Sequence, residues 1–239
     1  MMKKTLMEGL PGLGLALDEK TCDTLCAFGT AVVEQNKVMN LTAITQPDQV
    51  AKLHLLDSIS LLTLENLDGK KMIDVGCGAG FPTLPLAIFR PDITVIGLDG
   101  TAKRIEYVKS TAKKLGLLNV TAIAGRAEDY ANMPEYRERF DIATARAVAA
   151  LPILSEICLP FVKIGGKFIS MKASQGENEA ELAQNAITVC GGAISNISLL
   201  NLTADGENFE KRVIIEANKS KSTPSKYPRH YSQISKKPL

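Results

Sequence analysis

A glycine-rich loop and the acidic residues around it are the part of the sequence whose residue types can do chemistry. Asp74-Val75-Gly76-Cys77-Gly78-Ala79-Gly80 follows a short apolar run. Glycines at alternate positions let the backbone turn tightly and approach a ligand without obstruction by side chains. Asp99 ends the next apolar run, 23 residues after Gly76, and a carboxylate there can accept hydrogen bonds from both hydroxyls of a ribose. The pattern therefore indicates a nucleoside-containing cofactor.

The glycine spacing discriminates between two such cofactors. A dinucleotide fingerprint, Gly-x-Gly-x-x-Gly, ends in a glycine that lets helix and strand pack closely beside a pyrophosphate. Counted from Gly76 or from Gly78, that position holds Phe81 or Thr83. S-adenosylmethionine has no phosphate, and the acidic Asp74 disfavours phosphates while tolerating the cationic amino-acid part. The loop favours S-adenosylmethionine, and a nicotinamide oxidoreductase remains the rival from another class.

Two further motifs follow later strands. Ala127-Glu128 is placed to contact adenine, through a backbone N–H or through a carboxylate that accepts from the exocyclic amine. A helix cap or a surface charge is the alternative for Glu128. Arg146, between two alanines, can pair with the carboxylate of the cofactor or with a phosphate of the acceptor.

Missing motifs narrow the reaction. The stretch 144–148 lacks the Asp/Asn-Pro-Pro-Tyr/Phe motif common in enzymes that methylate exocyclic amines. None of the five cysteines follows a proline, as the nucleophile for pyrimidine carbon methylation typically does, and their spacing indicates no metal site. An acceptor with an exposed lone pair, such as guanine N7, needs neither device, because proximity and electrostatics carry the catalysis. No catalytic residue is assigned.

The elements that must position these residues change in type along the chain. The first third is helical, with a helix capped by Asp18 and another running from Pro47 to about Leu64, and no strand is expected before residue 70. The expected strands are 71–75, 93–98, 120–124, 140–144, 167–171, 194–202 and 213–217, and the intervening helices are 85–89, 101–115, 151–161 and 177–189. This alternation predicts an α/β, doubly wound, mostly parallel sheet with an antiparallel edge hairpin and an N-terminal helical appendage.

Charge and composition set the context. Hydrophobic residues make up 45% and charged residues 23% of the 239 residues, as in soluble globular proteins, and no apolar run is long enough to span a membrane. Glu8 and Pro11 interrupt the apolar N-terminus, which favours a cytoplasmic protein over a secreted one. After Glu216 the sequence has six basic and no acidic residues. This tail suits a polyanionic partner or simply improves solubility.

The motifs in their order resemble one family over about residues 30–239. The segments are 36–42, 54–58, 74–85, 90–91, 103–104, 126–128, 145–147 and 236–239. The chain resembles the bacterial glucose-inhibited division protein B family, the small-subunit ribosomal RNA guanine-N7 methyltransferases. It departs from the family at Gln35, Gly100 and Ala173, where tryptophan, serine and glycine are usual.

The resemblance implies a Rossmann-like class I methyltransferase fold, S-adenosylmethionine as donor, and N7 of a guanine in 16S ribosomal RNA, free or in the small subunit, as acceptor. It places cofactor contacts at Gly76, Phe81, the Ala127-Glu128 pair and Arg146, beside Gly78, Gly80 and Asp99 from the loop pattern. We expect three parts: a helical appendage (1–68), a methyltransferase domain (69–218) and a basic tail (219–239). No membrane or obligate protein partner is expected.

Two alternatives concern substrate and positioning. Another acceptor, or an RNA-binding assembly factor with a vestigial pocket, would preserve the same motifs. His54 and Asp57, one helical turn apart, can form a functional pair near the substrate, although a buried structural hydrogen bond between them is favoured.

Overall fold

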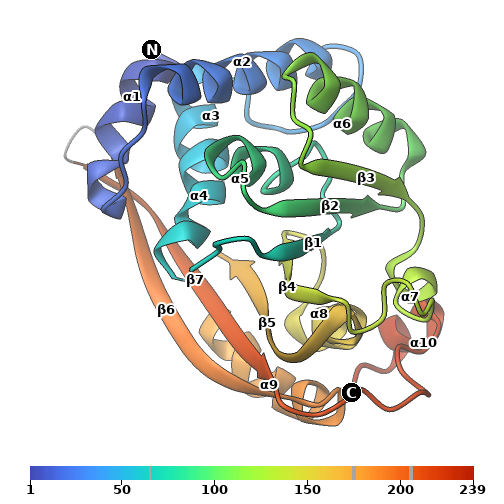
Figure 1. The fold of residues 1–239 in the computed structure, drawn as a ribbon. Helices are drawn as coiled ribbons and strands as arrows, with labels where there is room; N and C mark the ends of the chain where they lie inside the picture. The colour runs from blue at the N-terminus through green and yellow to red at the C-terminus, as the bar shows by residue number, and fades with distance from the viewer. Residues whose placement is uncertain (65, 174–175, 205–206) are drawn as a thin grey trace.

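The structure, a computed structural model, describes residues 1–64, 66–173, 176–204 and 207–239. Within these residues the strands form a single seven-stranded sheet in the order β3-β2-β1-β4-β5-β7-β6 (Figure 1). The strands are β1 (Lys71–Val75), β2 (Thr94–Asp99), β3 (Val120–Ala124), β4 (Phe140–Arg146), β5 (Val162–Lys172), β6 (Gly192–Ala204) and β7 (Glu207–Lys219). Strands β1 to β5 are parallel, and β7 is antiparallel to both β5 and β6. The predicted sheet class and its antiparallel edge hairpin are confirmed.

The register of the parallel strands brings their carboxyl ends to one edge. Ile73 of β1 pairs with Ile96 on one side and with Ala143 on the other. The central strands β1, β2 and β4 are buried along most of their length, as parallel strands covered by two helical layers must be. Because of this register, the loops after β1, β2, β3 and β4 lie together, where ligands bind in doubly wound sheets.

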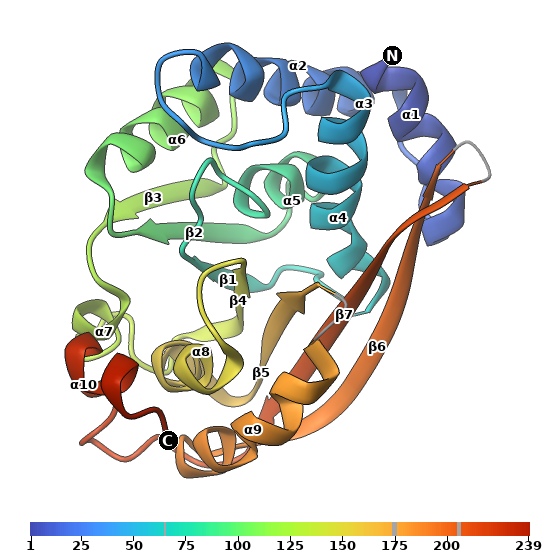
Figure 2. The same ribbon diagram turned by 180° about the vertical axis from the view of Figure 1, so that it is seen from behind.

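Helices cover both faces of the sheet (Figures 1 and 2). On one face, α5 (Thr83–Phe89) and α6 (Ala102–Lys114) pack with the N-terminal helices around buried residues such as Leu84 and Val108. On the other face, α8 (Leu151–Cys158), followed by η4 (Leu159–Phe161), and α9 (Gly176–Val189) enclose the largest hydrophobic cluster. No helix among the described residues is long and apolar enough to cross a membrane.

The N-terminal segment is helical, as the sequence predicted. It contains α1 (Met2–Gly9), η1 (Pro11–Leu13), α2 (Glu19–Asn36), α3 (Pro47–Val50), η2 (Ala51–Leu56), α4 (Asp57–Ile59) and η3 (Ser60–Thr63). Asp18 caps α2 by accepting from Thr21 N at 2.9 Å. The sequence did not predict α1, because Pro11, Gly12 and Gly14 interrupt its apolar pattern; burial of Leu6 and Leu10 against the following helices stabilises it. Because η2 is a π-helical turn, His54 lies on a different face than it would in a regular α-helix.

The edge hairpin and the segment after it are more extensive than the sequence suggested. Strands β6 and β7 have 13 residues each, beyond the expected 194–202 and 213–217. The last helix after β7 is α10 (Tyr231–Lys236), which lies beside α7 (Ala127–Tyr130) in both views (Figures 1 and 2). Arg137 donates to the carbonyl oxygens of Thr223 and Tyr227 at 2.8 and 2.9 Å. The C-terminal segment, residues 220–239, is therefore attached to the body of the protein.

Candidate active site

The glycine loop connects β1 to α5 at the carboxyl edge of the sheet. Gly76, Gly78 and Gly80 all have positive φ, at 80°, 56° and 95°. A Cβ on Gly76 would lie 2.4 Å from Cγ2 of Val148. The backbone N–H groups of Gly76 and Cys77 both donate to the carbonyl of Leu98, at 2.7 and 3.1 Å. The loop therefore requires glycine for its backbone conformation and, at residue 76, for space.

Asp99, at the end of β2, joins the glycine loop to the next helix. Its Oδ2 accepts from Gly78 N at 3.0 Å and its Oδ1 accepts from Thr101 N at 2.8 Å. Arg104 Nη1 lies 3.8 Å from Oδ2. A carboxylate has about four acceptor positions, so the two backbone bonds leave capacity for a pair of ligand hydroxyls.

A pocket at this edge, here called the rim pocket, collects residues from several strand ends. It has a volume of about 140 Å³ and is lined by Val75, Gly76, Leu98, Asp99, Gly100, Gly125, Arg126, Ala127, Glu128, Val148, Ile157 and Tyr231. Four of the predicted site residues meet here: Gly76, Asp99, Ala127 and Glu128. Glu128 is 4% exposed and its Oε1 accepts from Arg126 Nε at 3.2 Å, so it is not a surface charge.

The other predicted residues, Gly78, Gly80, Phe81 and Arg146, do not line the rim pocket. Gly78 shapes it indirectly through its bond to Asp99. Phe81 stacks on the imidazole of His54, with centroids 4.6 Å apart, and the guanidinium of Arg146 lies 5.3 Å from the Phe81 centroid. Of these groups, His54 and Arg146 line a second pocket.

This second pocket, here called the cationic pocket, has a volume of about 440 Å³. Its lining consists of Ile44, Leu53, His54, Asp57, Arg146, Ala147, Met171, Lys172, Ala173, Glu179 and Arg212. Asp57 is 3% exposed and binds two arginines, Arg146 Nη1 at 2.7 Å and Arg212 Nε at 2.9 Å. Lys172 Nζ binds Glu179 at 2.8 Å and the carbonyl of Ala149 at 2.6 Å. Among these lining residues three cations face two carboxylates, so the pocket suits an electron-rich ligand.

The predicted hydrogen bond between His54 and Asp57 does not form, so that prediction was wrong. His54 Nε2 lies 2.8 Å from Thr42 Oγ1 and Nδ1 lies 3.1 Å from the carbonyl oxygen of Leu53. Both oxygens of Asp57 are occupied by the two arginines instead. Burial lowers the pKa of His54 to about 4, against the opposing influence of the Leu53 carbonyl. The imidazole is therefore neutral at neutral pH, with Nδ1–H donating to Leu53 and Nε2 accepting from Thr42.

The loop after β4 separates the two pockets. Ala147 has a φ of 55°, a left-handed conformation that non-glycine residues seldom adopt. On one side of it Arg146 faces the cationic pocket, and on the other Val148 lines the rim pocket. Such strain persists where the surrounding structure enforces it, and it clusters at functional sites. One short loop therefore borders both pockets.

Asp74 lies beneath the glycine loop and is fully buried. Its Oδ2 accepts from Thr83 Oγ1 at 2.6 Å and from Thr83 N at 3.2 Å, whereas Oδ1 has no hydrogen-bond partner in the described part of the chain. Burial raises the pKa of Asp74 to about 7, although the bonds from Thr83 and the charge of Arg146 act in the opposite direction. A buried acceptor without a partner favours a nearby donor or cation.

Comparison with known sequences gives one consistent result. The profile described as "GidB: rRNA small subunit methyltransferase G" matches residues 21–206. The ribosomal RNA small subunit methyltransferase G of Desulfitobacterium hafniense (strain Y51) is 41% identical over 227 residues, covering 95% of this chain and 93% of the relative. The protein of the same name from Desulforamulus reducens is 43% identical over 236 residues, covering 98% and 97%.

Solved structures of lower identity share the fold. TYW2 of Pyrococcus horikoshii in complex with MeSAdo aligns with a TM-score of 0.55 at 13% identity, covering 70% of this chain and 63% of that one. TYW2 of M. jannaschii in complex with AdoMet gives a TM-score of 0.52 at 17% identity, covering 65% of this chain and 71% of that one. Precorrin-6y C5,15-methyltransferase from Geobacter metallireducens gives 0.53 at 16% identity, covering 69% and 88%. The fold is that of class I methyltransferases.

Proposed function

This chain belongs to the rRNA small subunit methyltransferase G (GidB) family, and from this we propose that it transfers a methyl group from S-adenosylmethionine to N7 of a guanine in 16S ribosomal RNA. The observation that supports the proposal most is that one short loop, which follows β4, borders two unlike pockets. The rim pocket suits a nucleoside, and the cationic pocket suits a nucleotide. We further propose that the enzyme acts in the cytoplasm on the RNA or on the small ribosomal subunit.

The residues of the rim pocket fit S-adenosylmethionine. Asp99 would accept from the ribose hydroxyls, and Ala127 and Glu128 would contact the adenine. The glycine cradle, which a Cβ at residue 76 would fill, would support the methionine part. Asp74 lies beneath this cradle, and its Oδ1, which accepts from no donor among the described residues, would attract the cationic ammonium group. When bound, this cofactor supplies a methyl group on a positively charged sulfur.

The cationic pocket fits the acceptor. Guanine presents O6 and N7 as acceptors on one edge, and the nucleotide carries a negatively charged phosphate. Arg212 and Lys172 would bind O6 or phosphate oxygens. Arg146 is fixed by Asp57 and lies over Phe81, so it would orient the part of a ligand that lies between the two pockets. Asp57 and Glu179 would offset the positive charge that develops on the base.

No general base is required in this reaction. N7 of guanine carries no proton, so no side chain of this protein would have to remove one before the base accepts the methyl group that the bound cofactor would supply. The neutral His54, with both ring nitrogens in use, is consistent with a positioning role. The relative placement of the two ligands in their pockets would therefore carry the catalysis.

A methyl-transfer experiment tests the proposal directly. Small subunits from a strain that lacks this gene would be incubated with the protein and S-adenosylmethionine, then subjected to N7-specific cleavage and primer extension. We expect one new cleavage site that depends on the protein and the cofactor. An RNA-binding assembly factor would leave the cleavage pattern unchanged, and methylation at another base atom would produce methyl incorporation without cleavage. S-adenosylhomocysteine should raise the melting temperature and NAD should not; the reverse would indicate a nicotinamide enzyme.

A further inference from the structure

The rim pocket includes one residue from the far end of the chain. Tyr231, the first residue of α10, lines it together with Asp99 and the stretch from Gly125 to Glu128. Figures 1 and 2 both show α10 beside α7, the short helix that carries Glu128. The C-terminal segment thus forms part of the wall of a pocket whose other residues come from strand ends, the segments that follow them and α8.

The Tyr231 ring is held in place by the loop after β3. The guanidinium carbon of Arg126 lies 4.6 Å from the ring centroid, within the range of a cation–π contact. Nε of the same arginine donates to Glu128 Oε1 at 3.2 Å. Tyr231, Arg126 and Glu128 therefore form a connected row along one side of the rim pocket.

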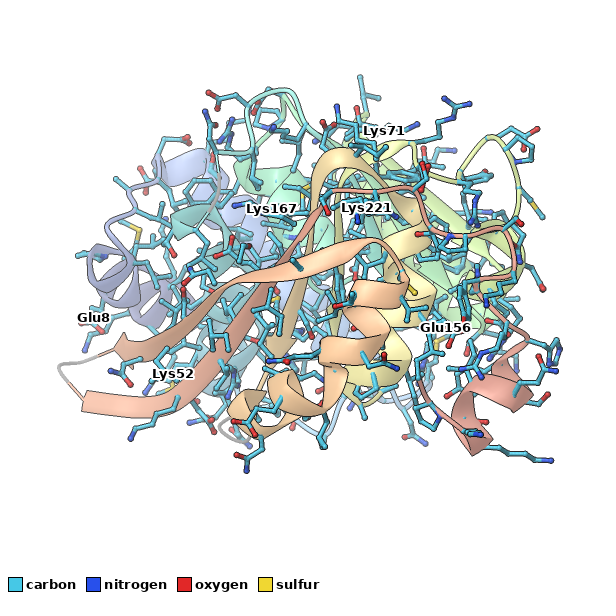
Figure 3. All side chains as sticks on the ribbon, turned by 90° about the horizontal axis from the view of Figure 1, so that it is seen from below. Glu8, Lys52, Lys71, Glu156, Lys167 and Lys221 are labelled. Atoms are coloured by element: carbon cyan, nitrogen blue, oxygen red, sulfur yellow. The ribbon has the colours of Figure 1, made fainter. Side chains whose placement is uncertain are left out.

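The C-terminal segment is anchored just before this tyrosine. Glu156, which is labelled in Figure 3, belongs to α8 and is fully buried. Its carboxylate accepts from Arg229 N at 2.9 Å, Nε at 2.8 Å and Nη2 at 2.6 Å. Ile234 of α10 is also fully buried, in the cluster beneath α8. Contacts on both sides of Tyr231 therefore fix its position against the pocket.

We propose that Tyr231 is a cofactor-binding residue whose ring packs against the adenine base of S-adenosylmethionine. The inference rests on the cofactor assignment in the proposed function and extends it to the C-terminal segment. If Asp99 accepts from the ribose, the base extends away from the glycine loop toward residues 125–128, where the tyrosine ring stands. An aromatic ring in that place offers a surface on which the adenine can stack, as bases commonly do in proteins.

The aromatic composition of the chain provides a direct readout. It has no tryptophan and five tyrosines, so its intrinsic emission comes from tyrosine alone. Adenine stacked on Tyr231 should quench part of that emission as S-adenosylhomocysteine is added. Tyr231→Phe should keep most of the calorimetric affinity but lose that part of the quenching, because phenylalanine stacks without emitting at the tyrosine wavelength. Tyr231→Ala should bind S-adenosylhomocysteine about 5- to 150-fold more weakly, the range found when a stacking side chain is truncated.

Tyr227→Phe is the matched control. Tyr227 is 8% exposed, belongs to the same segment and does not line the rim pocket, so its variant should keep both the quenching and the affinity. Wild-type quenching in Tyr231→Phe, or wild-type affinity in a folded Tyr231→Ala, would overturn the inference while leaving the cofactor assignment intact. A wild-type protein that does not bind S-adenosylhomocysteine would instead contradict the proposed function.

Discussion

Asp57 and Arg146 form a buried ion pair with 2.7 Å between Oδ2 and Nη1, although 89 residues separate them in sequence. Arg212 binds the other oxygen of the same carboxylate at 2.9 Å. The sequence suggested Arg146 as a partner for the cofactor carboxylate or for an acceptor phosphate. The structure adds an internal carboxylate that fixes the direction of its side chain, between the two pockets.

Arg146→Ala should therefore lower both stability and turnover. Loss of a charge-assisted hydrogen bond to a buried carboxylate costs about 1.5–3 kcal/mol of the free energy of unfolding, and Arg212 should limit the loss to the lower part of this range. Turnover at saturating cofactor should fall further than stability explains. Urea unfolding and a methyl-transfer assay measure the two effects. Arg90→Ala is the control, because Arg90 pairs with Asp68 and Asp92 away from both pockets; equal turnover loss in both variants would contradict a role for Arg146 at the site.

Asp99→Ala should weaken the binding of S-adenosylhomocysteine by about 1.5–3 kcal/mol, the worth of charge-assisted hydrogen bonds to the ribose. Titration calorimetry on the folded variant measures this. Asp92→Ala is a close match, because Asp92 also accepts a glycine N–H, from Gly69 at 3.0 Å, but lies outside the rim pocket. Unchanged affinity in Asp99→Ala would refute the ribose assignment.

Gly76→Ala should abolish or strongly weaken cofactor binding. The substitution combines a φ of 80° with a Cβ only 2.4 Å from Val148 Cγ2. Gly69→Ala has a similar φ of 62°, and no atom of the described residues lies within 4 Å of the added Cβ, so it should lose about 1 kcal/mol of stability and no affinity. A Gly76→Ala, Val148→Ala double variant should recover part of the affinity. If all three variants bind equally well, crowding of the loop is unimportant.

Asp74 should make stability depend on pH. Its pKa is raised by burial to about 7 from an ordinary 3.8, so the folded state binds its proton more tightly than the unfolded state does. Its contribution is fully present below about pH 4 and is lost as the pH rises toward 7, at up to about 1.4 kcal/mol per pH unit. His54, whose pKa is lowered by burial to about 4 from 6.5, has the opposite effect within that window.

The Asp74→Asn variant separates the contribution of Asp74 to stability from that of His54, because His54 is present in both proteins. The free energy of unfolding of the variant minus that of the wild type should increase as the pH rises from 4 to 7. Urea unfolding at pH 5, 6 and 7 measures the difference. A difference that stays constant across these values would show that Asp74 remains ionised throughout.

The basic C-terminal segment should contribute to RNA binding through its exposed lysines. Lys236 and Lys237 are exposed, whereas Lys219 is 1% exposed and Arg229 is bound to Glu156. If both exposed lysines meet phosphates of a single strand, Lys236→Gln with Lys237→Gln should reduce the magnitude of the slope of log affinity against log salt by about 1.4. Affinity for S-adenosylhomocysteine should not change. Filter binding across a salt series measures the slope, with Lys20→Gln on α2 as a control. If the double variant has the same slope as the wild-type protein, these lysines are only solvated charges.

The sheet and the glycine loop could be predicted because their signals are local. Apolar runs of about five residues define β1 to β4, and the segments between them have apolar residues at helical spacing. Gly76 and Asp99 lie at the strand ends, where a parallel sheet must place them. Four of the predicted residues meet in one pocket for this reason. Helix α1 was missed because its stability comes from burial against α2 and η2 rather than from its own pattern.

The cationic pocket could not be predicted in the same way. Arg212 reaches Asp57 from 155 residues away, on a hairpin longer than its apolar pattern indicated. The proposed wall residue Tyr231 stands among Ser, Lys and His, where nothing local distinguishes it from a solvated tail. Both depend on strand order and on ion pairs between distant segments, which a single sequence does not reveal.

The position of Tyr231 has a consequence for the timing of biosynthesis. The glycine loop leaves the ribosome roughly 150 residues before this tyrosine does, which at about 5–20 residues per second is about 8–30 s earlier. During that interval the nascent chain holds the first strands and the loop, while one side of the rim pocket is still missing. A chain still being translated would thus hold its cofactor less tightly than the released protein.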